Sequence, residues 1–280
     1  MRLLALSDVH VNHAGNLAAL AQIPVHPDDW LILAGDVADR VDDVDACLAL
    51  MTERFARVLW VPGNHELWAP TGSRGEARYR ELVEVCRARR VDTPEDPWPR
   101  WPADPSLVIA PLFLLYDYSF GPPGYPPAEA IAWAAEEGIR CVDEALLHPD
   151  PWPTRQDWCA ARLRVTRARL DALAPGDRTV LINHWPLRGD LCRLPRIPRF
   201  RVWCGTRETE DWHTRYRAEV VVTGHLHMRA TDWRDGVRFE EVSLGYPRHW
   251  LVERGAAAYL REILPGPEAR LDHAGPTWHR

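Results

Sequence analysis

The chain has 280 residues, of which 46% are hydrophobic, so it contains enough apolar material for one large domain with a sizeable core. Its formal net charge of −6 makes the whole molecule a poor electrostatic match for nucleic acid or for an anionic membrane. The sequence contains no uninterrupted apolar stretch of about 18 residues and no signal-peptide pattern at its start. We therefore expect a soluble, cytoplasmic protein that does not bind membranes, and we make no prediction of its oligomeric state.

Two residue types narrow the chemistry further. The six cysteines are scattered and form no C-x-x-C pair, which indicates small buried side chains in a reducing compartment rather than disulfides or a thiolate metal site. All 34 basic residues are arginines, and the planar guanidinium pairs well with phosphate. The composition is therefore compatible with a phosphate-bearing substrate.

The first ninety residues alternate short apolar runs with stretches of helical periodicity. The predicted elements, in chain order, are a strand over 3–6, a helix over 16–23, a strand over 30–34, a helix over 41–55, a strand over 57–61 and a helix over 78–89. This rhythm is typical of a sheet-centred α/β domain built from βαβ units.

The remaining elements are less regular. After a Pro-, Asp- and Trp-rich connection over 91–105, we expect a strand over 107–116, helices over 128–147 and 156–173, strands over 179–182 and 219–222, and a hairpin over 229–244. The residues after 264 are rich in Pro and Gly. We therefore expect one domain over 1–264, with a Trp/Pro-rich insertion or cap around 92–215, and a loose tail over 265–280.

Five polar sequence motifs each follow a predicted strand or lie in the loop that it enters. They are Asp8-Val9-His10, Gly35-Asp36, Gly63-Asn64-His65-Glu66, Asn183-His184 and Gly224-His225-Leu226-His227. In an open α/β sheet the loops at the carboxyl ends of the strands converge on one crevice, so these side chains are expected to line one metal pocket. Taken singly, Asp8 or Asp36 is better explained as a turn or helix-cap residue, and only the ordered set is specific.

The ordered motifs D-x-H, G-D, G-N-H-[DE], H and G-H-x-H, spanning residues 8 to 227, resemble the signature of the calcineurin-like metallophosphoesterases. The resemblance implies a four-layer α/β/β/α sandwich, with two mixed β-sheets flanked by helices. It also implies two divalent metal ions, the first held by Asp8, His10 and His227, the second by Asn64, His184 and His225, and both bridged by Asp36. The reaction implied is hydrolysis of a phosphate monoester or diester by a hydroxide that bridges the two ions.

The ligand types fit this chemistry. Imidazole, carboxylate and amide ligands without a thiolate suit Mn, with Fe or Zn as alternatives. Two such cations can clamp an in-line displacement at phosphorus and acidify the attacking water, so no Ser or Cys nucleophile is required.

By the same resemblance, His65 either donates a proton to the leaving oxygen or stabilises the charge that develops there. Asp39 occupies the position from which related enzymes orient this histidine, although the residue is almost equally suited to cap the helix that begins near Val41. Glu66 is expected to support the loop that carries Asn64.

Substrate selection is less constrained. Arg40, Arg188 and Arg193 are candidates to contact a substrate phosphate, and the segment 188–207 also carries Phe200 and Trp203, which can stack on a flat group. The alternatives are an exposed arginine at a helix start and a solvated loop with ion pairs. We expect a small-molecule phosphate ester rather than nucleic acid as the substrate. A nuclease acting on DNA or RNA and a non-catalytic scaffold are the competing hypotheses.

Overall fold

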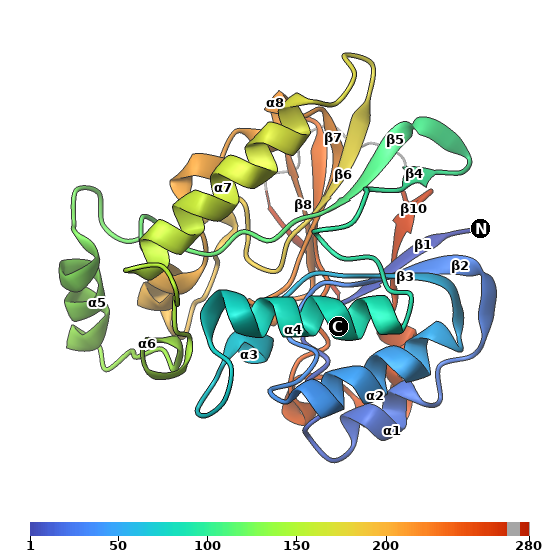
Figure 1. Cartoon of the computed structure of the whole chain (residues 1–280), viewed down its shortest axis with the longest axis horizontal. Helices are drawn as coiled ribbons and strands as arrows, with labels where there is room; N and C mark the ends of the chain where they lie inside the picture. Colours follow the sequence, from blue (N-terminus) through green and yellow to red (C-terminus); the bar gives the residue numbers. More distant parts are fainter. Residues whose placement is uncertain (268–274, 280) are drawn as a thin grey trace.

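Two β-sheets pack face to face, with helices on both outer sides, in the computed structural model that describes residues 1–267 and 275–279 (Figure 1). The smaller sheet has the strand order β10-β1-β2-β3, and the larger has the order β11-β8-β9-β7-β6-β5-β4. Each sheet contains both parallel and antiparallel pairs. The predicted four-layer α/β/β/α sandwich is confirmed.

The smaller sheet and its helices come mostly from the first ninety residues. Its strands are β1 (Leu3–Leu6), β2 (His26–Leu33), β3 (Phe55–Trp60) and β10 (Arg261–Leu264). The helices on its side are α1 (Asn16–Leu20), α2 (Val41–Thr52), α3 (Asn64–Leu67) and α4 (Gly75–Ala88) (Figure 1). Strands β1, β2 and β3 are parallel, so their carboxyl ends meet at one edge.

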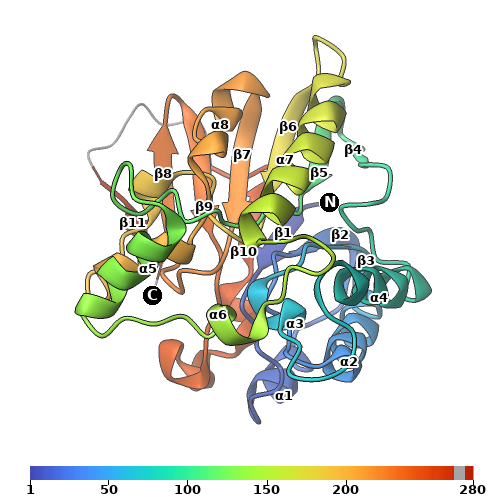
Figure 2. The ribbon, with the colours of Figure 1, turned by 60° about the vertical axis from the view of Figure 1, so that its left-hand side comes forward.

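The larger sheet is built from the rest of the chain. Its strands are β4 (Arg100–Trp101), β5 (Asp104–Pro111), β6 (Arg178–Ile182), β7 (Ala218–Thr223), β8 (Ala230–Arg234), β9 (Val237–Glu241) and β11 (Thr277–Trp278). Helices α7 (Arg155–Asp171) and α8 (Trp212–Arg215) lie on its outer side, whereas α5 (Pro127–Glu136) and α6 (Asp143–Leu146) lie beyond one end of it (Figures 1 and 2). Short 3₁₀ turns complete the chain: η1 (Gly189–Leu191), η2 (Pro198–Trp203), η3 (Arg207–Thr209), η4 (Pro247–His249), η5 (Val252–Arg254) and η6 (Ala256–Tyr259).

The period-2 geometry of the strands explains why their apolar runs are continuous. In β1, Leu3 and Ala5 join the core between the two sheets, whereas Leu4 and Leu6 join the core beneath the helices. Ile109 and Val180, from the larger sheet, belong to the same inter-sheet core. Because both faces of the central strands are buried, nearly every strand position has to be apolar.

Several predicted elements differ in extent from the structure: the strand expected over 107–116 ends at Pro111, and the helix expected over 16–23 ends at Leu20. The largest difference concerns a helix. The single helix expected over 128–147 is divided into α5 and α6. Gly138 lies between them with a φ of 73°, in the left-handed region where a helix cannot continue.

The predicted insertion over 92–215 and the predicted tail over 265–280 can be compared with the structure. Within 92–215, strands β4, β5 and β6 belong to the larger sheet. Residues 268–274 and 280 of the expected tail lie outside the described residues, and β11 pairs with β8. Among residues 1–267 and 275–279, every helix is too short or too polar to cross a membrane.

Candidate metal centre

The seven predicted metal ligands lie together at the carboxyl ends of strands from both sheets. Those that follow β1, β2 and β3 belong to the smaller sheet, and those that follow β6 and β7 belong to the larger one. The two sheets are joined beside the site by a parallel bridge between Ser7 and Ser243. The site therefore spans the boundary between the two sheets.

The backbone at the site adopts a conformation that ordinary residues rarely use. Five candidate ligands have a positive φ, namely Asp8 (51°), His10 (40°), Asp36 (53°), His225 (72°) and His227 (53°). Glycines allow the loops to approach so closely: a Cβ on Gly63 would lie 2.1 Å from Asp36 Oδ1, and one on Gly224 would lie 1.9 Å from Ser7 Oγ. Such clustered backbone strain is typical of functional sites.

The first group of ligand atoms comprises Asp8, His10 and His227. Asp8 Oδ1 lies 2.9 Å from His227 Nε2, and the two histidine Nε2 atoms lie 3.3 Å apart. All three residues offer ligand atoms within 4.8 Å of one another. Donor atoms at these separations can share one cation at ordinary coordination distances of about 2.0–2.2 Å.

The second group comprises Asp36, Asn64, His184 and His225. Asn64 Oδ1 lies 3.2 Å from both His184 Nε2 and His225 Nδ1, and Asp36 Oδ2 lies 3.5 Å from His184 Nε2. Asp36 also groups with His10, whose ligand atom belongs to the first group. This carboxylate therefore lies between the two groups of ligand atoms.

The electrostatics suit bound cations. Burial raises the pKa of Asp36, but His184 and His65 outweigh it, so the pKa lies well below its ordinary value. Burial lowers the pKa of His10 and of His225 to about 3, so both imidazoles are neutral and keep a lone pair for a metal. Burial also lowers the pKa of His184, but Asp36 reverses the effect and raises it to about 10. A metal ion would therefore have to displace a proton from His184, whereas His10 and His225 are already neutral. Carboxylate, imidazole and amide groups form a donor set that fits a divalent metal ion of the Mn, Fe or Zn type.

Hydrogen bonds behind the ligands hold them in orientation. His184 Nδ1–H donates to the Ala34 carbonyl at 2.9 Å, which leaves Nε2 toward the site. Asn64 Nδ2 donates to Asp143 Oδ1 at 3.1 Å, so the amide oxygen faces the histidines. Fixed outer partners of this kind orient metal ligands and adjust their basicity.

Glu66 supports the loops in the way expected for it. Its buried carboxylate accepts hydrogen bonds from the backbone N–H groups of Asp36, Val37 and Gly63, at 2.8 to 3.0 Å. One side chain therefore fixes the loop after β2 against the loop after β3.

His65 lies at the edge of the cluster with its predicted partner. Its Nδ1 is 2.7 Å from Asp39 Oδ1, and α2 begins after Arg40 without a side-chain cap, so the structure favours the pairing over the capping alternative. Burial lowers the pKa of His65, but Asp36 and Asp39 raise it by more, to about 9. His65 is therefore held protonated, with Nε2 directed away from Asp39.

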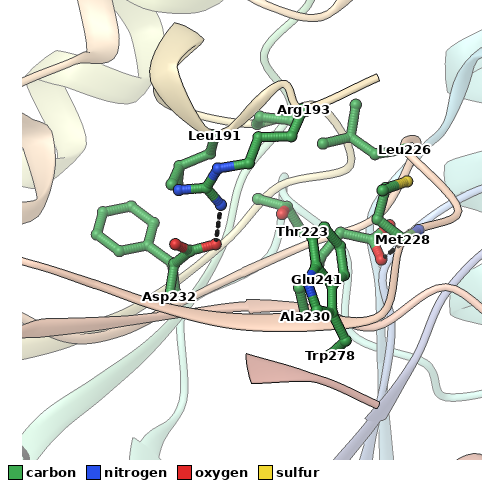
Figure 3. A pocket seen from close by; sticks show the side chains of 11 residues that line it. Leu191, Arg193, Thr223, Leu226, Met228, Ala230, Asp232, Glu241 and Trp278 are labelled. Atoms are coloured by element: carbon green, nitrogen blue, oxygen red, sulfur yellow. Dashed lines mark hydrogen bonds and ion pairs between the residues drawn. The ribbon is translucent and has the colours of Figure 1, made fainter. Parts of the chain in front are cut away.

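The predicted substrate arginines are less clearly placed. The Arg40 side chain is 74% exposed and lies 3.6 Å from Asp42. Arg193 is paired with Asp232 at 2.6 Å, in a cavity of about 20 Å³ that Leu226 and Met228 also line (Figure 3). That volume holds little more than a water molecule, so the cavity is too small for a substrate.

Most arginines of the segment 188–207 have partners within the protein. These contacts are Arg188 with Asp190, Arg193 with Asp232, Arg199 with Glu136, Arg201 with the Gly189 carbonyl and Arg207 with the Ser119 carbonyl. The segment still borders the site, because Phe200 stacks on His225 with ring centroids 5.8 Å apart. The arginine pairing weakens the feature that supported the nuclease hypothesis.

Three residues at the site were not identified from the sequence. Asp143 orients Asn64, His249 Nδ1 lies 3.0 Å from His227 Nδ1, and the Tyr246 ring stacks on His10 at 4.5 Å. None of them lies in a recognisable motif. The clustering of Tyr246 and His249 just after an expected hairpin strand was the one available signal.

Comparison with known proteins agrees with this geometry. The family model of the calcineurin-like phosphoesterases matches residues 1–229. The chain belongs to this family and is a metal-dependent hydrolase of phosphate esters. It is therefore an enzyme, and the scaffold hypothesis is set aside.

A sequence and a crystal structure, both named PptH and both from Mycobacterium tuberculosis, resemble the chain. The chain is 50% identical, over 95% of its own length and 84% of the relative's, to a protein named [acyl-carrier-protein] phosphodiesterase PptH. It also superimposes with a TM-score of 0.90 and 48% identity on the crystal structure of phosphopantetheinyl hydrolase PptH, covering 96% of this chain and 98% of that one.

Proposed function

We propose that this enzyme hydrolyses the phosphodiester that joins phosphopantetheine to an acyl carrier protein. The single observation that supports this substrate is the 50% identity to a phosphodiesterase of that name over nearly the whole chain. The site geometry adds support, because every position of the ligand pattern carries a residue able to bind metal.

We further propose that the site holds two divalent ions, with Mn first among the candidates. The enzyme would act in the cytoplasm. Asp8, His10 and His227 would hold one ion, Asn64, His184 and His225 would hold the other, and Asp36 would contact both. When bound, such cations neutralise charge on the phosphate and acidify the attacking water.

The protein's own groups supply the remaining chemistry. His65 Nε2 lies 3.8 Å from Asp36 Oδ2, on the side of the candidate metal ligands, and the protonated ring would donate a proton from this nitrogen to the leaving oxygen of the carrier protein. Asp39 fixes the ring through Nδ1 and stabilises the imidazolium. Arg40, which is exposed just beyond Asp39, would contact an anionic group of the incoming substrate.

The proposal is tested by incubating the Mn²⁺-loaded enzyme with a phosphopantetheinylated carrier protein and following its mass. The expected result is the apo carrier protein together with free phosphopantetheine. The Asp36→Asn variant serves as the inactive control. Cleavage of a labelled oligonucleotide or of a nitrophenyl monoester, with the carrier protein left intact, would show that the substrate assignment is wrong.

A further inference from the structure

Tyr246 lies in the metal site although it comes from a segment beyond residues 1–229, which the family model matches. The segment follows β9 and is attached to the loop that carries Asp8. Leu244 N donates to the Ser7 carbonyl at 2.8 Å, and Gly245 N donates to the Asp8 carbonyl at 2.9 Å. Gly245 has a φ of 85°, and this left-handed turn directs the chain toward the site. The position of Tyr246 is therefore fixed by the same backbone that fixes a candidate ligand.

The ring and the hydroxyl of Tyr246 have different surroundings. The ring packs on His10 at 4.5 Å with an interplanar angle of 25°, and its centroid lies 5.0 Å from that of His227. A phenylalanine would make the same ring contacts. The hydroxyl lies 3.5 Å from His65 Nε2, which is the nitrogen that Asp39 does not occupy.

This arrangement places two donors beside one position. A group that receives a proton from His65 Nε2 has to approach within about 3 Å of it. The Tyr246 hydroxyl lies 3.5 Å from that nitrogen, so a group that approaches His65 on the side of Tyr246 meets both donors. We propose that Tyr246 is a further catalytic residue, whose hydroxyl donates a hydrogen bond to the leaving oxygen while His65 protonates it. This inference rests on the proposed phosphodiester hydrolysis but not on the identity of the leaving alcohol.

The step balances without any further reactant. A water oxygen forms a bond to phosphorus and releases one proton to solvent. The bond from phosphorus to the leaving oxygen breaks, and its electron pair stays on that oxygen. The oxygen takes a proton from His65 Nε2, which solvent later replaces, and Tyr246 keeps its own proton throughout. The hydrogen bond from Tyr246 lowers the energy of the charge that develops before the proton arrives.

The test uses Tyr246→Phe, which retains the ring and removes the hydroxyl. Tyr125→Phe is the matched control, because Tyr125 is 47% exposed in the turn before α5, away from the site segments. Both variants are loaded with Mn²⁺ and compared with the unaltered enzyme on methyl aryl phosphodiesters whose leaving phenols range from acidic to weakly acidic.

The expected result is a loss that grows as the leaving phenol becomes less acidic. For Tyr246→Phe we expect kcat to fall by roughly 100-fold with the least acidic phenol, because a developing oxyanion has lost one donor. With nitrophenol, which leaves readily as an anion, the fall should be less than about threefold. Tyr125→Phe should show no loss across the series. An equal loss with every ester, or no loss at all, would overturn the assignment.

Two further readouts exclude a merely structural effect. The metal content by elemental analysis and the melting temperature should be the same for Tyr246→Phe and the unaltered enzyme. A lower value of either would show that the hydroxyl supports the site rather than the reaction. Because the aryl esters contain no carrier protein, failure of the proposed carrier-protein substrate would leave this test intact.

Discussion

The hydrogen bonds to Asp143 allow the orientation of Asn64 to be tested directly. Asp143 is fully buried, and its Oδ1 accepts from Asn64 Nδ2 at 3.1 Å and from Trp68 Nε1 at 2.7 Å. In Asp143→Leu both donors lose their acceptor, while the branched shape is kept with two methyl groups that are larger than the oxygens they replace. Each unsatisfied buried donor costs about 1–3 kcal/mol, and Trp68 is only half-buried, so we expect the free energy of unfolding to fall by about 2–4 kcal/mol.

The metal affinity should fall as well, because the Asn64 amide becomes free to rotate. Loss of an outer partner typically lowers metal affinity by about 10–100-fold, and we expect this for the ion held by Asn64 only. Asp143→Asn is the matched control, since its amide oxygen can still accept both hydrogen bonds. Calorimetric titration with Mn²⁺ and denaturant unfolding provide the measurements. Equal affinities for Asp143→Leu and the unaltered enzyme would refute the orienting role.

Four further predictions concern single residues. His65→Ala should abolish turnover while the metal content stays the same, and unchanged turnover would exclude the acid role. Asp39→Asn should lower kcat by roughly 10–100-fold, since general acid catalysis contributes about 10²–10⁴-fold. Asp36→Asn should lose both metal ions by elemental analysis, and a variant that keeps two equivalents would show that Asp36 does not bridge them. The Trp158 ring is 1% exposed and packs edge-on against Phe113. Trp158→Ala should therefore lower the free energy of unfolding by about 3–5 kcal/mol. A loss below about 1 kcal/mol in chemical denaturation would contradict that packing role.

The clustering of the candidate metal ligands could be predicted because each lies just after a strand and carries a chemically distinctive side chain. Asp8, Asp36 and Asn64 follow consecutive parallel strands, so sheet geometry alone brings them to one edge. His184 and His225 follow two strands that are also neighbours in the other sheet. The order of the motifs along the chain therefore predicts that these side chains lie close together.

The outer partners of the ligands could not be predicted in the same way. Asp143 lies 79 positions from Asn64, at the start of a four-residue helix, and no spacing rule connects them. Tyr246 reaches the site through a left-handed glycine turn that the sequence does not announce. The division of the expected 128–147 helix was also missed, because Ala-rich helical periodicity outweighed a single glycine in the prediction.

The origin of the ligands in two different sheets has a consequence for how the molecule holds together. Four of them follow strands of the smaller sheet and three follow strands of the larger one, and Asp36 meets His184 across the boundary. An ion bound by residues from both sheets would act as a non-covalent cross-link between them, in addition to their shared apolar core. Bound metal would then raise the free energy of unfolding. The increase grows with the logarithm of the ratio between the free metal concentration and its dissociation constant. Both the activity of this enzyme and its stability against unfolding would therefore depend on bound metal.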